Sequence, residues 1–257
     1  MKNFIMLKSN TGKKNNFLII LSIILILSIW KIISVFVSSD IIFPSPEKTI
    51  VRLFEIILEK DFIKIIYHSL IRGFLGFILS FALGIILGIS AGFNKIFFKM
   101  FEPVIVAVKS TPLMSIILVA LIWLKSGNVP VFASFLVSFP IIYTSIVEGI
   151  KNVDHKIIEM ASLYKVKKAR ILSEIYMPAI MPFIISSSLA SLGIGWKAVI
   201  AAEVLSNPEY AIGTSMQLSK VYLQTDKVIA WTVIVVMISF VFEKIIRLAE
   251  KRIVRWK

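Results

Sequence analysis

The 257-residue chain contains no cysteine and only two histidines. Without cysteine it forms neither disulfides nor thiolate sites. Three apolar runs separate His68 from His155, which places the two side chains on opposite sides of a membrane. A membrane-embedded enzyme would need clustered His, Asp and Glu side chains, so we expect no catalytic residue, no metal site and no enzymatic activity.

The chain also lacks a Gly-x-x-x-x-Gly-Lys-Ser/Thr phosphate loop. We therefore expect it to bind no ATP by that motif and to carry no cofactor. Acidic residues are few as well. The chain has 15 aspartates and glutamates and 29 lysines and arginines, which gives a formal charge of +14. In a soluble protein such an excess would suggest a nucleic-acid partner.

Apolar residues, in contrast, make up 58% of the chain, and the mean hydropathy is +0.89. They gather in six runs that lack strict alternation and exceed the roughly 10 residues of a barrel strand, which favours helices. The sequence predicts an all-α polytopic membrane protein with about six transmembrane helices: Phe17–Val37, Ser69–Gly92, Pro112–Leu124 with its approach from Pro103, Val129–Ile150, Phe183–Leu205 and Val228–Leu248.

The basic residues are distributed unevenly between the two sides of this topology. With the N-terminus in the cytoplasm, eighteen of the 29 fall in cytoplasmic segments and seven in outer ones. This excess follows the positive-inside rule, so we expect both termini in the cytoplasm and no nucleic-acid partner. The first apolar run is too long for a signal peptide, which favours a retained anchor. We predict a cytoplasmic tail and first helix over residues 1–42 and a core domain over residues 43–257.

A short helix is predicted after the first span, with Ser45 as its N-cap and Pro46 at its first position. Its apolar side lies opposite its charged side. We expect it to lie on the outer membrane surface or, alternatively, to pack on the other spans. The apolar side comprises Ile50, Val51, Phe54, Ile57 and Leu58.

The next spans contain a glycine repeat and one interruption of the apolar pattern. Gly84, Gly88 and Gly92 recur every four residues in the second span, where packing within the chain is favoured over a dimer seam. Before the third span, proline disfavours helix in the segment Lys109, Ser110, Thr111 and Pro112. This segment is either a hinge that lines the transport path or an ordinary kink at the membrane edge.

The fifth span contains three candidates for the transport path, Trp196, Lys197 and Glu203. Glu203 lies about 31 Å along the helix from Pro182, so we expect a solvated carboxylate at the outer interface. Lys197 lies about 9 Å deeper, where it either snorkels to the interface or faces the path.

Residues 151–182 form a charged segment between two apolar runs. Asp154 is expected to cap a helix that runs to about Tyr164, and a second helix is expected from about Lys167 to Met177, ending at Pro178. Helices outside the bilayer cannot bury an apolar face in lipid, so the face must pack within the loop or on another protein. On the first helix this face comprises Ile157, Met160, Ala161 and Tyr164.

The same segment resembles the EAA motif of ABC-importer permeases, which reads Glu-Ala-Ala, three residues, Gly, and further on Leu-Pro and Pro. Here it reads Glu159-Met160-Ala161, then Lys165, Met177-Pro178 and Met181-Pro182. From about Phe43 onward the chain is similar to the sulfonate/taurine/nitrate-type permeases. Their Pro-Ser-Pro, His-Ser-Leu-x-Arg and Val-Ala-Ala-Glu features correspond to Pro44–Pro46, His68–Arg72 and Ile200–Glu203.

The resemblance implies a type I ABC-importer permease fold in the bacterial cytoplasmic (inner) membrane, surrounded by lipid and paired as a homodimer around one path. It implies two partners: an extracytoplasmic substrate-binding protein and a cytoplasmic ABC ATPase, which hydrolyses the ATP and grips the loop 151–177. It also implies which residues couple the permease to the ATPase: Ile157, Glu159, Met160, Ala161, Tyr164, Lys165, Pro178 and Pro182.

Glu159 is expected to hold the shape of the loop through backbone donors or Arg170. Lys165 stands where the family has glycine, and a lysine at positive φ costs about 1 kcal/mol, so either the turn differs in shape or the partner compensates. The implied substrate is a small anion or heterocycle such as a sulfonate, nitrate or a vitamin precursor. An ion-coupled secondary transporter is the alternative, but the span interiors offer only Lys31 and Lys197 and no acidic relay.

Overall fold

The structure is a computed structural model that describes residues 11–253. These residues form helices and connecting turns and no strand, which confirms the all-α class. The chain divides into two compact units. Among the described residues, the first unit comprises residues 11–59 and 218–233, and the second comprises residues 60–217 and 234–253.

In the first unit, α1 (Thr11–Val37) and α2 (Pro46–Leu58) are joined by a tight connection. The Trp30 indole donates to the Pro44 carbonyl at 3.0 Å, and Lys31 pairs with Glu47 at 2.9 Å. The hydrogen bond from Lys31 lowers the pKa of the Glu47 carboxyl to about 2, so this carboxylate stays ionised at physiological pH. Ser45 caps α2 as predicted, by accepting from the Lys48 backbone N–H at 3.4 Å.

The polar side of α2 contacts the first turns of α11 (Thr225–Ile253). Arg52 pairs with Asp226 at 2.8 Å, and Lys227 pairs with Glu59 at 2.6 Å. The predicted apolar side of α2 is exposed along its whole length, up to 85% at Leu58. This agrees with a helix that lies on a membrane surface.

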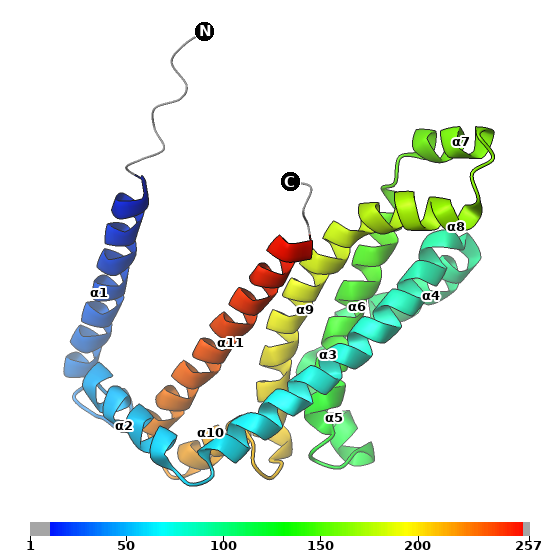
Figure 1. The fold of residues 1–257 in the computed structure, drawn as a ribbon. Coiled ribbons are helices and arrows are strands. Elements are labelled where there is room, and N and C mark those ends of the chain that lie inside the picture. Colours follow the sequence, from blue (N-terminus) through cyan, green and yellow to red (C-terminus); the bar gives the residue numbers. More distant parts are fainter. Residues whose placement is uncertain (1–10, 254–257) are drawn as a thin grey trace, which may run out of the picture. The chain divides into compact units, whose positions relative to one another are not determined.

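The second unit is built around α6 (Val129–Lys151), which packs between α3 (Phe62–Phe93) and α9 (Met177–Ser206) (Figure 1). One cluster of its core is aliphatic at the centre and consists of Ile142, Ile146, Ile150 and Ile180. The packing of α6 on α3 and α9 is the most extensive in the described chain, and it forms the frame on which the loops of the second unit are held.

The three regularly spaced glycines of α3 face three isoleucines of α6 with the same spacing. A Cβ atom added to Gly84, Gly88 or Gly92 would lie 2.8, 3.0 or 2.5 Å from the side chain of Ile142, Ile146 or Ile150, respectively. The glycines therefore allow two helix backbones to approach within the chain. The prediction that this face packs intramolecularly is confirmed.

The third predicted span is broken. α4 (Lys95–Ser110) and α5 (Leu113–Trp123) meet at Thr111 and Pro112 with a bend of 100°. Five helices of the described chain are long and apolar enough to cross a membrane, and there are six candidate spans if this bent pair counts as one. The predicted number of about six is confirmed in this sense.

The predicted helix end at Pro178 is wrong. Residues Lys168–Ser206 form one continuous helical stretch in which α8 (Lys168–Ile171), a π-turn (Leu172–Tyr176) and α9 follow one another. The Met177 N–H reaches the Leu172 carbonyl five residues back. Such a wider turn accommodates a proline ring that would collide with the carbonyl four residues before it in a regular helix.

Candidate functional site

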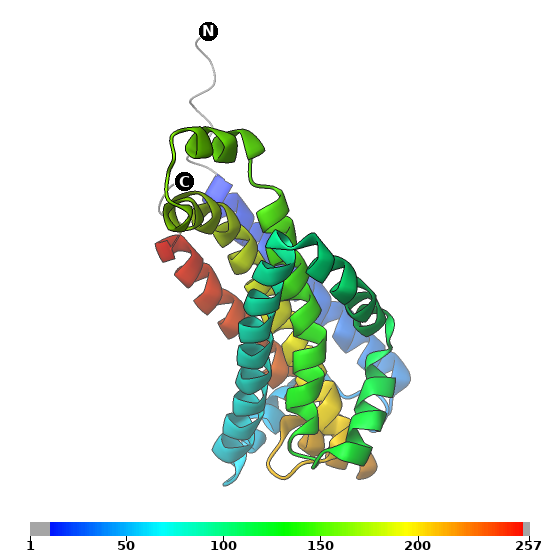
Figure 2. The ribbon, with the colours of Figure 1, turned by 90° about the vertical axis from the view of Figure 1, so that its right-hand side faces the viewer.

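The charged loop folds as predicted at its start. Asp154 caps α7 (His155–Leu163) by accepting from the Lys156 N–H at 2.9 Å. Figures 1 and 2 show α7 beside α8, at the end of the second unit where α6 finishes. The helix is thus held outside the packed core formed by α3, α6 and α9.

Most of the apolar face of α7 is uncovered. Ala161 is 6% exposed and anchors the helix, whereas Ile157 is 44%, Met160 54% and Tyr164 80% exposed. Of the two alternatives for this face, packing within the loop accounts for Ala161 alone. The other three side chains form a ridge that the described chain leaves open, and we call Ile157, Met160 and Tyr164 the α7 ridge.

Lys165 adopts the conformation that a glycine would adopt, with φ of 52°. Its N–H donates to the Ser162 carbonyl at 3.0 Å, and the Val166 N–H donates to the Ala161 carbonyl at 3.0 Å. This pair of bonds is the Schellman motif that closes helix C-termini. The turn therefore has the left-handed geometry that suits glycine, although its residue is lysine.

The predicted partner of Glu159 is wrong. Arg170 pairs with Glu174, one turn further along its own helix, at 2.8 Å. Glu159 is exposed, and no hydrogen bond or ion pair of its side chain occurs within residues 11–253. An i,i+4 pair forms locally, whereas the α7 carboxylate would have to reach across the turn.

At the opposite end of α9, Glu203 is fully buried rather than solvated, which corrects the sequence-based expectation. Ser69 donates its hydroxyl to the carboxylate at 2.8 Å, Arg72 pairs with it at 3.0 Å, and the Gly213 N–H donates at 3.1 Å. The segment after α9 folds back over the helix end and removes the carboxylate from solvent. A buried carboxylate needs such partners, and here it has them.

Arg72 extends this cluster to the returning segment. Its guanidinium donates to the backbone carbonyls of Glu209 at 2.9 Å and Tyr210 at 3.1 Å. Gly213 is required by space, because a Cβ atom there would lie 2.5 Å from the Glu203 Cβ. We call Ser69, Arg72, Glu203 and Gly213 the Glu203 clasp. It joins two features that lie far apart in the sequence, the His-Ser-Leu-x-Arg entry and the Ala-Ala-Glu stretch.

The remaining candidates for the transport path occupy two other places. At the α4–α5 break, Lys109 lies 3.5 Å from the Thr144 hydroxyl, and the Thr111 hydroxyl donates to the Ala107 carbonyl at 2.7 Å. In α9, Trp196 is 3% exposed and Lys197 is exposed. No hydrogen bond or ion pair within the described chain joins the break to Trp196, Lys197 or Glu203.

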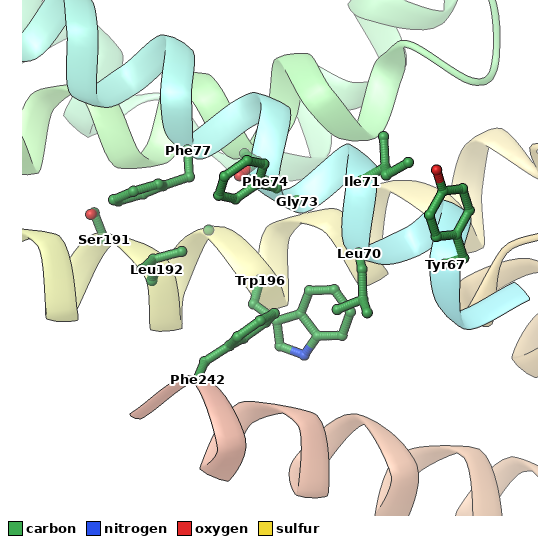
Figure 3. Close-up of a pocket in the computed structure, with 12 residues that line it drawn as sticks. Tyr67, Leu70, Ile71, Gly73, Phe74, Phe77, Ser191, Leu192, Trp196 and Phe242 are labelled. Carbon is green, nitrogen blue, oxygen red and sulfur yellow. The ribbon is translucent and has the colours of Figure 1, made fainter. Parts of the chain in front are cut away.

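An apolar pocket of about 290 Å³ lies between α3, α9 and the second half of α11 (Figure 3). Phe74 and Phe77 line it from α3, Leu192 and Trp196 from α9, and Phe242 from α11. Sequence reasoning missed Phe242, because a single phenylalanine in an apolar span carries no distinguishing signal. The described residues contain no group of three or more His, Asp or Glu side chains that could hold a metal ion.

The long apolar helices of the described chain define a multi-pass α-helical membrane protein. A family model supports this class: residues 80–255 match the binding-protein-dependent transport system inner membrane component. The chain belongs to this family of multi-pass inner-membrane permeases, and its relatives include ABC-importer permeases of the sulfonate/taurine type.

Individual relatives point the same way. The chain is 27% identical to the aliphatic sulfonates transport permease protein SsuC of Bacillus subtilis, over 90% of this chain and 84% of that protein. It is 25% identical to the taurine transport system permease protein TauC of Escherichia coli, over 61% of this chain and 57% of that protein. A chain of the inward-facing methionine ABC transporter MetNI superposes with a TM-score of 0.54 at 12% identity, covering 72% of this chain and 92% of that one. This last match confirms the ABC-importer permease fold.

Proposed function

We propose that this permease imports a small organic sulfonate, and that its loop 151–177 transmits the closure of a separate ABC ATPase to the membrane helices. The single observation that supports the coupling role best is the α7 ridge. Ile157, Met160 and Tyr164 are apolar, exposed and held on a capped helix outside the membrane core. Exposed apolar side chains gathered on one face are typical of a protein interface.

The long helix that begins within the loop is suited to transmit a movement of the loop to the membrane. From Lys168 to Ser206 it is continuous, so it extends over 39 residues, or about 58 Å. One end adjoins α7, and the other end is fixed by the Glu203 clasp. When ATP brings the two ATPase subunits together, the loops approach one another and these helices swing as rigid bodies.

The substrate class is inferred from the relatives, because SsuC and TauC are named for aliphatic sulfonates and taurine. The partners follow from the family: a substrate-binding protein delivers the solute, and the ATPase supplies the energy. We further propose a homodimer with the path between its copies, lipid around it, and both termini in the cytoplasm, as the distribution of basic residues favours.

The coupling role is tested by placing a charge on the α7 ridge. In proteoliposomes that contain the permease, its ATPase and its binding protein, Met160→Asp is expected to abolish ATP-driven uptake of taurine or butanesulfonate. Ala161→Asp, at the buried residue of the same face, is expected to have the same effect while the protein still inserts. His155→Gln, on the opposite side of α7, serves as the matched control and should transport normally.

The same assay separates the two functions considered for the chain. Uptake that needs ATP and survives collapse of the proton gradient supports the importer. Uptake that persists without ATP and stops when the gradient collapses would establish an ion-coupled secondary transporter instead. Wild-type uptake by Met160→Asp would remove the coupling assignment.

A further inference from the structure

A second hollow lies next to the apolar pocket, between α9 and the second half of α11. It has a volume of about 460 Å³, and its lining includes Gly193 and Lys197 of α9 and Glu243 and Arg247 of α11. Leu192, Trp196 and Phe242 line both this hollow and the apolar pocket. The two are therefore neighbouring parts of one groove, which we call the α9–α11 groove.

Trp196 forms the wall between the two parts. Its indole meets the Phe242 ring edge to face, with centroids 5.5 Å apart, and its N–H donates to the Val235 carbonyl at 3.4 Å. Figure 3 shows the two rings facing one another between α9 and α11. With its polar atom already bonded, Trp196 presents an apolar surface to whatever enters the groove.

The charges in the groove do not cancel. Arg247 and Glu243 pair with each other, at 2.7 Å between the guanidinium and the carboxylate. Lys197 is exposed and forms no salt bridge with any residue of the described chain. The groove therefore holds one uncompensated positive charge beside an apolar wall, within a segment that crosses the membrane.

We propose that the α9–α11 groove is an anion subsite of the transport path, in which the Lys197 ammonium pairs with a sulfonate group and Trp196 and Phe242 contact its alkyl chain. This inference rests on the proposed function. A single ammonium on a flexible stem attracts an anion without the fixed two-point geometry that arginine imposes. A subsite that the solute must leave again needs an attraction of this limited kind.

Gly193 provides a direct way to probe the groove. It lies one helical turn before Lys197 and lines the groove, and apart from its chain neighbours and the nearby backbone of its own helix no atom lies within 4 Å of a Cβ atom added there. The chain contains no cysteine, so Gly193→Cys introduces its only thiol. The new side chain enters open space and stands next to the lysine.

The test measures the rate at which this thiol reacts with two water-soluble reagents, in the full complex in proteoliposomes. One is 2-sulfonatoethyl methanethiosulfonate, an anionic alkyl sulfonate, and the other is its cationic trimethylammonium analogue. Adding Lys197→Gln should lower the ratio of the anionic to the cationic rate by at least about fivefold, whereas Lys197→Arg should preserve it. Excess butanesulfonate should slow the anionic reagent.

Gly127→Cys is the matched control, because it too meets nothing within 4 Å and lies in the loop between α5 and α6. Its rate ratio should not change with Lys197→Gln. Failure of Gly193→Cys to react with either reagent would show that lipid or a second copy fills the groove, and would overturn the proposal. A rate ratio that is insensitive to Lys197→Gln would overturn it equally.

Uptake distinguishes failure of this inference from failure of the proposed function. If the wild-type complex shows no ATP-driven uptake of taurine or butanesulfonate, the proposed function itself is wrong and the subsite falls with it. If the wild type transports, Lys197→Gln should reduce uptake about tenfold, with ATPase stimulation by the loaded binding protein retained. Unchanged uptake by Lys197→Gln would refute the subsite and leave the proposed function standing.

Discussion

At the scale of single residues, the molecule relies on a few positions whose conformation or charge is unusual. Lys165 occupies a left-handed conformation in a Schellman turn, and Glu203 is a carboxylate removed entirely from solvent. Sequence reasoning identified both residues but not their surroundings. The family pattern drew attention to Lys165, whereas nothing local indicated that the chain returns over Glu203, because Arg72 lies 131 positions away.

Replacing Lys165 with glycine should stabilise the loop. The left-handed conformation strains a residue with a Cβ atom and suits glycine, so Lys165→Gly should raise the free energy of opening this turn by about 1 kcal/mol. Amide hydrogen exchange at Val166, whose N–H closes the turn, measures the effect. Lys156→Gly in the regular helix α7 should act in the opposite direction, by a similar amount. Faster exchange in Lys165→Gly would contradict the role assigned to the turn.

Removing the charge of Glu203 should destabilise the second unit. Glu203→Gln leaves the Arg72 guanidinium, which is only 11% exposed, without its anion, and we expect a loss of about 3 kcal/mol in the free energy of unfolding. Unfolding in mixed micelles of dodecyl maltoside and SDS gives this quantity. Glu209→Gln is the control, because Glu209 contributes only its backbone carbonyl to the cluster. Equal stabilities of the two variants would show that the clasp has no structural role.

At the scale of elements, apolar patterning predicted most of the helices. Five of the six predicted spans fall inside single helical stretches: Phe17–Val37, Ser69–Gly92, Val129–Ile150, Phe183–Leu205 and Val228–Leu248. The prediction of helix interruptions held at one proline and failed at another. At Pro112 the helix does break, by 100°, whereas at Pro178 a π-turn keeps it continuous. Which of these occurs depends on what packs around the proline, and that information is not local in sequence.

The contact between α3 and α6 supplies a prediction at this scale. Gly84→Ala places a methyl group 2.8 Å from Ile142, so the helices must separate, and we expect a loss of about 1–3 kcal/mol. Gly193→Ala is the matched control in open space, where alanine should be neutral or stabilise by up to about 1 kcal/mol. The same micelle titration measures both, and a neutral Gly84→Ala would contradict the close approach.

At the scale of the whole molecule, composition and charge distribution indicated a membrane protein, and motif order indicated an ABC-importer permease, which the family match confirms. The groove between α9 and α11 could not be predicted, because it depends on how two distant helices face each other. The α7 ridge is an exposed apolar surface of the described chain, and a second protein would have to cover it.

A single cross-linking experiment tests that central claim most directly. Met160→Cys would be the only thiol of the chain, because the natural sequence has no cysteine, and it lies on the exposed ridge. After a thiol-specific photo-cross-linker is attached to the complex in its own membrane, illumination should join Met160→Cys to an ATP-binding subunit, and Gly127→Cys should give no such product. Labelling of Met160→Cys only from outside intact cells, or cross-linking of Gly127→Cys alone to the ATPase, would contradict the account.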